Sequence, residues 1–158
     1  MTARRARQAA GFTLVEVMVV LVIIGITLGL VSLNAMPSTH QNLEGEAKRI
    51  ALLLQLARDE AIVRNRLVAF EADPEGYRFL VRNEAQWTPL LQDDMLRGRP
   101  FKSAPLKLLL DPAGAGSANP LRITFGREPV DKPFTLTLAN GDDSVAIRAD
   151  GIGHFSVE

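Results

Sequence analysis

The sequence contains no cysteine, so disulfide bonds and thiolate metal sites are excluded. Histidine is scarce too, because His40 and His154 are the only two and neither has a cluster of acids at ligand spacing. We therefore expect no metal site built from histidine and carboxylate ligands. Asp142, Asp143 and Asp150 supply too few oxygens for calcium, which takes about six to eight, and we interpret them as solvated turn residues.

Catalytic and nucleotide-binding motifs are also missing. The sequence has no G-x-S-x-G nucleophile turn, no H-E-x-x-H zinc helix and no glycine-rich phosphate loop. Its serines have no local context that would activate a nucleophile. We therefore expect neither catalytic residues nor a cofactor, and a role other than that of an enzyme.

Neither sign of charge is in excess, with 18 basic and 18 acidic side chains in 158 residues. The distribution is uneven, because Arg4, Arg5 and Arg7 precede the first acidic residue, Glu16. Without residues 1–11 the chain keeps 15 basic and 18 acidic side chains, a net charge of −3. A general nucleic-acid-binding protein needs a basic surface, so nucleic acid is not an expected partner.

One long apolar run, residues 12–33, carries a single charge, that of Glu16. As a helix it would rise about 33 Å, enough to cross a bilayer core of about 30 Å. Many of its residues are β-branched, but lipid favours a helix because a helix pairs every backbone polar group within the segment. Gly25 and Gly29 form a pair of small residues that lets two helices approach closely.

The arginines before this run set its orientation, since basic flanking residues stay in the cytoplasm. We expect residues 1–11 on the cytoplasmic side of the inner membrane and residues from 34 onward on its outer side. An ordinary secretory signal has a shorter apolar core, followed by small residues at the cleavage site. Here Ala9, Ala10 and Gly11 come before the run, so cleavage at this point would leave the anchor attached.

The segment from Gly11 to Glu16 resembles the prepilin cleavage and methylation motif of type IV pilins and type II secretion pseudopilins. That pattern is a basic leader ending in glycine, then phenylalanine, then a glutamate inside an apolar helix, and this sequence matches at Gly11, Phe12 and Glu16. The resemblance implies that a prepilin peptidase cleaves between Gly11 and Phe12. It also implies that Phe12 is N-methylated.

Glu16 has two interpretations. An acid in a membrane helix costs several kcal/mol unless it has a partner, and the α-amino group that cleavage creates at Phe12 is the obvious one. This partner could lie one turn away or on a neighbouring subunit of a filament. Alternatively, Glu16 is an interfacial carboxyl near the lipid headgroups. The spacing leaves both open, and the resemblance favours the role in assembly.

A second helix is expected after the apolar run. Pro37 should kink or end the first helix, because a proline removes one backbone hydrogen bond. Residues 42–65 then place apolar residues at spacings of three and four, as an amphipathic helix that packs on a domain does. The stripe consists of Leu43, Ala47, Ile50, Leu54, Ala57 and Ala61. The two helices could form one rod with a bend near Pro37.

From residue 67 onward the pattern alternates with period two, which is typical of half-buried strands. The expected strands are residues 67–72, 76–82, 86–91, 106–110, 121–125, 134–139, 145–149 and 152–157. Residues 97–100 are expected to form a turn, and residues 111–120 an exposed, mobile loop. Asn140-Gly141 suits a tight hairpin turn. Trp87, the only tryptophan, is either a core residue or a surface anchor, and we expect it in the core.

These elements predict an α+β fold, in which a long N-terminal helix, half transmembrane and half amphipathic, packs on an antiparallel β-sandwich. The expected parts are a cleaved leader at 1–11, a transmembrane helix at 12–33, a linker and amphipathic helix at 34–66, and a periplasmic β domain at 67–158. This pilin-like layout resembles the H-type minor pseudopilins of type II secretion and their FimT-like and FimU-like relatives.

The resemblance implies a structural subunit near the tip of the type II secretion pseudopilus, which helps to export folded exoproteins. Its implied partners are other minor and major pseudopilins, the prepilin peptidase, the inner-membrane secretion platform and exoprotein substrates. The alternative is a FimT-like or FimU-like minor pilin of a type IV pilus, with a role in DNA uptake. That role needs a basic patch on the C-terminal domain. The candidates are Arg78, Arg82, Arg97, Arg99, Lys102 and Lys107.

Overall fold

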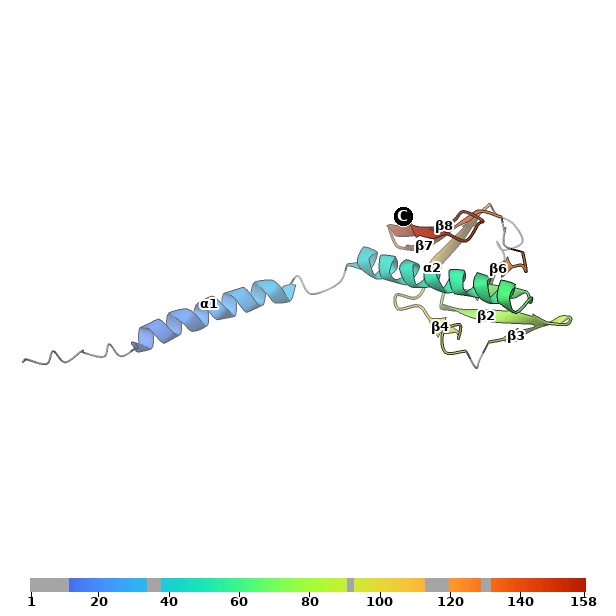
Figure 1. Ribbon diagram of the computed structural model, residues 1–158. Helices are drawn as coiled ribbons and strands as arrows, with labels where there is room; N and C mark the ends of the chain where they lie inside the picture. The colour runs from blue at the N-terminus through green and yellow to red at the C-terminus, as the bar shows by residue number, and fades with distance from the viewer. Residues whose placement is uncertain (1–11, 34–37, 91–92, 113–119, 129–131) are drawn as a thin grey trace, which may run out of the picture. The chain divides into compact units, whose positions relative to one another are not determined.

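The computed structural model describes most of the chain after residue 11 (Figure 1). The described residues are 12–33, 38–90, 93–112, 120–128 and 132–158, with side chains in the first segment only up to Gly29. The expected leader, the residues around Pro37 and most of the loop at 111–120 lie outside them. The chain divides into two units, one up to Pro37 and one from Ser38 to Glu158, which are described separately here.

The first unit contains helix α1, Leu14–Leu33. Thr13 caps it, because its Oγ1 accepts the N–H of Glu16 at 3.3 Å and its carbonyl accepts the N–H of Val17 at 3.3 Å. Thr27 is satisfied within the helix, since its hydroxyl donates to the Ile23 carbonyl at 2.9 Å. Among the residues that the structure describes, no helix is both long enough and apolar enough to cross a membrane.

The second unit begins with helix α2, Thr39–Val63, three residues before the expected start. A capping box explains the earlier start: Ser38 Oγ accepts the N–H of Gln41 at 3.2 Å, and Gln41 Oε1 accepts the N–H of Ser38 at 3.1 Å. The predicted apolar stripe is confirmed, because all six of its residues are buried. The helix ends where Asn65 takes a positive φ of 52°.

In the described part of the chain after α2 there are nine strands, and every pairing between them is antiparallel. Their bounds are β1 Val68–Ala72, β2 Gly76–Asn83, β3 Gln86–Pro89, β4 Arg99–Pro100, β5 Lys107–Asp111, β6 Leu121–Phe125, β7 Phe134–Asn140, β8 Asp143–Ala149 and β9 Phe155–Val157. One sheet has the order β3-β2-β1-β6, with β4 beside β2, and the other has the order β5-β7-β8-β9. The expected hairpin at Asn140-Gly141 is confirmed as β7 and β8.

The apolar core lies where α2 packs on both sheets (Figure 1). Phe70, Phe79 and Phe125 enter it from the first sheet, and Leu136 and Ile147 enter it from the second. All of these side chains have relative exposures of 0–1%, so they are shielded from solvent. The predicted fold class, a helix packed on antiparallel sheets, is therefore confirmed.

Two strand predictions were wrong in detail. The expected turn at residues 97–100 contains a strand, β4, which pairs with β2 because Gly76 has no side chain: a Cβ there would lie 2.7 Å from the Arg99 carbonyl oxygen. The final strand is shorter than the expected 152–157. Asp150 Oδ1 accepts the N–H groups of Ile152 and His154, at 2.8 and 3.0 Å, and holds the intervening residues in a turn.

Trp87 is not a core residue. It lies half-buried on β3, opposite Arg82 in the strand register. The Arg82 and Arg122 guanidinium carbons lie 5.8 and 5.6 Å from the centre of its ring, so two cations flank one indole. The tryptophan therefore belongs to the outer face of the first sheet, and the prediction of a core position was wrong.

Candidate processing and assembly site

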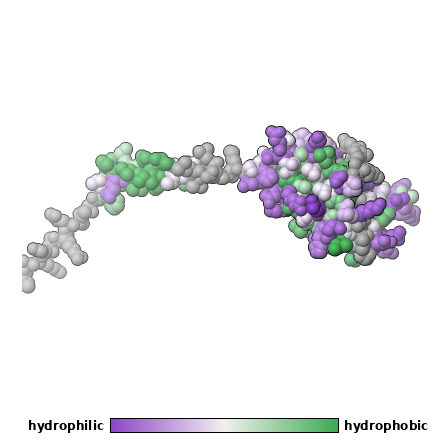
Figure 2. All heavy atoms as spheres, turned by 90° about the horizontal axis from the view of Figure 1, so that it is seen from above, coloured by the Kyte–Doolittle hydropathy of each residue, from purple (hydrophilic) through white to green (hydrophobic). Residues whose placement is uncertain are grey.

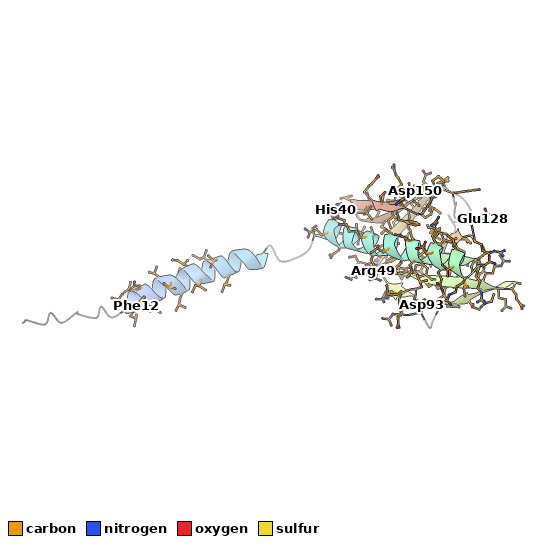
Figure 3. The ribbon with its side chains drawn as sticks, in the orientation of Figure 1. Phe12, His40, Arg49, Asp93, Glu128 and Asp150 are labelled. Atoms are coloured by element: carbon orange, nitrogen blue, oxygen red, sulfur yellow. The ribbon has the colours of Figure 1, made fainter. Side chains whose placement is uncertain are left out.

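The predicted processing residues lie where α1 begins. Phe12 comes directly before the capping residue Thr13, and its side chain is 79% exposed (Figure 3). Glu16 lies in the first turn of the helix, also exposed. Gly11, the residue expected before the cleaved bond, lies outside the described residues. The structure thus places Phe12 and Glu16 at the same helix end and describes nothing of the leader.

The electrostatics of this helix end favour an acid. The free N–H groups of the first turn carry the positive end of the helix dipole, equivalent to about half an elementary charge. An α-ammonium group at Phe12 would add a full positive charge at the same place. Glu16 carries the only charged side chain in residues 12–33, so it is the one group in the segment that can balance them.

The rest of α1 presents apolar side chains all round. From Leu14 to Leu28 its large side chains are between 45% and 77% exposed, and Figure 2 shows this stretch as a hydrophobic rod. A helix that is apolar on every side is suited to lipid or to the core of an assembly. Gly25 and Gly29 have open space where a Cβ would lie, which leaves room for a neighbouring helix.

The residues considered for metal binding are not brought together. Asp142 and Asp143 lie at the β7–β8 turn, whereas Asp150 follows the other end of β8. Asp150 instead pairs with His154, whose Nδ1 lies 3.0 Å from Asp150 Oδ2. His40 is exposed in the first turn of α2. Within the described part of the chain, no group of three or more His, Cys, Asp or Glu residues could hold a metal ion.

The first sheet contains a charged cluster that the sequence did not reveal. Glu71 on β1 is 2% exposed, and its register partners are Arg78 on β2 and Arg122 on β6. Arg78 Nε donates to Glu71 Oε1 at 2.7 Å, and Arg122 Nε donates to Oε2 at 3.0 Å. Burial raises the pKa of Glu71, but the hydrogen bonds from both arginines outweigh burial and leave that pKa below its usual value.

This cluster weakens the case for a basic patch on the C-terminal domain. Arg78 was one of the candidates for a basic patch, and Glu71 neutralises part of its charge. The signal that would have revealed the cluster is the strand register, because the three residues lie up to 51 positions apart in the chain. No local pattern in the sequence contains that information.

An apolar first helix with an acid in its first turn, followed by a helix packed on two antiparallel sheets, defines a type IV pilin-like subunit. Two family models match the chain. The Prokaryotic N-terminal methylation motif matches residues 6–32, and Type II transport protein GspH matches residues 46–153. The chain belongs to the GspH family, whose members are minor pseudopilins.

Two relatives agree with this assignment. Type II secretion system protein H of Pseudomonas aeruginosa is 39% identical over 90 residues, which cover 55% of this chain and 52%, about half, of the relative. The protein of the same name from Aeromonas hydrophila is 26% identical, and the match covers 96% of this chain and 94% of that protein. Both are secretion proteins, so they support the secretion pseudopilus and not the type IV pilus.

Solved structures show the same fold. The solution structure of Escherichia coli GspH has a TM-score of 0.57 and 19% identity, over 76% of this chain and 91% of that one. The minor pseudopilin EpsH of Vibrio cholerae has a TM-score of 0.57 and 18% identity, over 74% and 96%. The minor pilin FimU of Pseudomonas aeruginosa has a TM-score of 0.54 and 19% identity, over 73% and 87%.

Proposed function

We propose that the mature protein begins at Phe12, is anchored in the inner membrane by residues 12–33, and joins the type II secretion pseudopilus at or near its tip. The observation that carries this proposal is the N-terminal methylation motif on an apolar helix, ahead of a GspH domain in the same chain. The role is structural: the subunit helps to nucleate the filament whose growth exports folded exoproteins. A separate cytoplasmic ATPase supplies the energy.

The proposed membrane anchor rests on the chemistry of residues 12–33. They contain one charged side chain, and in the part with described side chains the large apolar groups all face outward. The hydroxyl of Thr27 donates to carbonyls of its own helix, so it needs no water. The arginines at positions 4, 5 and 7 keep the N-terminus in the cytoplasm and direct the domain at 38–158 into the periplasm.

The proposed partners follow from this topology. The prepilin peptidase acts at the bond between Gly11 and Phe12, on the cytoplasmic side. Other minor and major pseudopilins pack against α1 and the domain, the inner-membrane secretion platform delivers the subunit, and exoproteins meet its periplasmic domain. No enzymatic activity is proposed for the chain.

Mass spectrometry of the protein from cells that contain the peptidase tests the processing step. The expected mature species starts at N-methylated Phe12, and cells without the peptidase should keep the full chain. Gly11→Val should block cleavage because it changes the residue before the bond, whereas Ala10→Val is the matched control and should be processed. An intact N-terminus in peptidase-positive cells would refute the proposal.

A further inference from the structure

Arg66, Arg82 and Arg127 line one cleft of the domain, and none of them has an acidic partner among the residues that the structure describes. The cleft has two connected parts, of about 710 and 390 Å³, which share Arg66, Arg82 and Glu84. Arg127, just after β6, lines the smaller part. Asn83 lines the larger part and accepts a 3.4 Å hydrogen bond from Arg66 Nη1. These residues come from four segments: the connection between α2 and β1, β2, the turn after β2, and the loop after β6.

The described arginines of the domain differ in whether they have an acidic partner and in whether they line this cleft. Six arginines pair with an acid within 4.0 Å, namely Arg49, Arg58, Arg64, Arg78, Arg122 and Arg148. Among the described residues, five arginines form no such pair, namely Arg66, Arg82, Arg97, Arg99 and Arg127. Of these, Arg66, Arg82 and Arg127 line this cleft, together with Glu84. Three exposed cations in one concave surface repel one another, and a bound anion would relieve that repulsion.

Arg82 is the best-positioned of the three. Its guanidinium stacks over Trp87, and its Nε donates to the Glu84 carbonyl at 3.4 Å. These two contacts restrict the side chain but leave both terminal nitrogens without a partner among the described residues. A guanidinium held in this way offers two parallel N–H groups, the geometry that a carboxylate accepts.

The cleft lies at the end of the domain opposite Ser38. Helix α2 has 25 residues, so it rises about 37 Å between its cap at Ser38 and the segment that contains Arg66. The β2–β3 turn and the loop containing Arg127 both line the cleft at this end, and Figure 3 labels the neighbouring residue, Glu128, at the end of the domain away from His40. Because the proposed anchor precedes Ser38 in the chain, this end of the domain is the one farthest from that attachment point.

We propose that this cleft binds a carboxylate-rich segment of a protein partner in the periplasm, through Arg66, Arg82 and Arg127. That the partner is periplasmic rests on the proposed function, whereas the anion chemistry rests on the cleft itself. A protein segment suits the cleft better than nucleic acid. A nucleic-acid-binding protein needs a basic surface, whereas the chain without its leader carries a net charge of −3.

Fluorescence anisotropy of the full mature chain in neutral detergent tests the proposal, with labelled hexaglutamate as the probe and hexaglutamine as its uncharged control. At low salt, hexaglutamate should bind and hexaglutamine should not, and binding should weaken at high salt. Arg66→Gln, Arg82→Gln and Arg127→Gln should each weaken binding about two- to fivefold, as expected for exposed ion pairs. The triple variant should lose binding.

Two further variants separate the cleft from general charge effects. Arg97→Gln removes an exposed arginine outside the cleft and should leave binding unchanged. Glu84→Gln removes the one acid among the described lining residues and should strengthen binding. Equal weakening by Arg97→Gln, or no binding of hexaglutamate, would overturn the proposal. So would tighter binding of a labelled single-stranded oligonucleotide through the same arginines. The two proposals fail independently. A lack of hexaglutamate binding would not contradict cleavage after Gly11, and a chain that keeps its leader would not contradict hexaglutamate binding by the cleft.

Discussion

Glu71 is almost fully buried and remains charged because two arginines approach it from the strands on either side. Replacing Glu71 with glutamine leaves both guanidinium groups beside a neutral amide, whose oxygen is a weaker hydrogen-bond acceptor than a carboxylate. Arg78 and Arg122 are 58% and 40% exposed, so water compensates them in part. We expect Glu71→Gln to lower the free energy of unfolding by about 1–3 kcal/mol, in the range for hydrogen bonds to charged groups.

The pH dependence of this effect has a definite sign. The folded-state pKa of Glu71 lies below its ordinary value of 4.5, because both arginines donate hydrogen bonds to the carboxylate. The carboxylate therefore contributes stability above pH 4.5, and this contribution is lost as the pH falls through the lower folded pKa. Denaturant unfolding of the domain at residues 38–158, followed by Trp87 fluorescence, should show a constant advantage of wild type over Glu71→Gln from pH 7 to about pH 5. The advantage should shrink below pH 4.5. An advantage that grows on acidification would contradict this account.

At the scale of one element, α2 contains a glycine that its structure does not require. Gly45 is exposed in the helix, and nothing lies within 4 Å of the position that a Cβ would take. Gly45→Ala should stabilise the domain by about 0.5–1 kcal/mol, because alanine loses less backbone entropy in a helix. The measurement is the denaturation midpoint.

Gly141 provides the matched control, since the same methyl group is added at another open position. It lies in the β7–β8 turn with φ at +60°, a conformation that alanine adopts at a cost. Gly141→Ala should therefore destabilise the domain although nothing obstructs its methyl group. The same sign for both substitutions would mean that contacts, and not backbone conformation, decide the effect.

The sequence predicts an element well when residues close together in the chain determine it. The stripe on α2 and the hairpin at Asn140-Gly141 follow from short-range periodicity and turn chemistry, and both predictions were confirmed. β4 is two residues long and exists only because Gly76 admits a distant strand. The outer-face positions of Trp87 and Glu71 likewise depend on which strands are neighbours, and strand order was not predictable from the chain.

The same distinction applies to the candidate site. Gly11, Phe12 and Glu16 form a contiguous motif, so the sequence alone reveals them, and their roles in processing and assembly remain predictions. The cleft of Arg66, Arg82 and Arg127 is assembled from segments up to 61 positions apart and needed the structure. Sequence proximity had grouped Arg82 with Arg78, which the fold assigns to Glu71.

At the scale of the whole molecule, the division before Ser38 predicts an independent domain. Every residue of the apolar core lies within the unit from Ser38 to Glu158. A chain without residues 1–33 should therefore be soluble and folded, with both helix and strand in its circular dichroism spectrum. A chain that begins at residue 65 is the control and should aggregate, because it lacks the α2 face of the core. Aggregation of the longer fragment would show that the boundary is wrong.

The final prediction concerns the role of Glu16 in assembly of the filament. If its carboxylate accepts the Phe12 ammonium of a neighbouring subunit, each unpaired subunit leaves two charges in an apolar environment. Removing one partner of such a buried pair costs about 3–5 kcal/mol, although the pair itself adds little net stability. Pairing would thus favour the correct alignment of neighbouring subunits, because a misplaced subunit cannot form the ion pair.

Glu16→Ala should then leave membrane insertion and cleavage at Gly11 intact, since neither step needs the carboxylate. Copurification of partner pseudopilins and secretion in a complemented null strain should fall sharply. Glu16→Asp should be intermediate, because its carboxylate is one methylene short, and Thr27→Ala is a control that changes a polar group of α1 outside its first turn. Cleavage and copurification are scored separately. Full secretion with Glu16→Ala would rule out pairing in this subunit but not its place in the family, because a subunit at the tip has fewer neighbours above it.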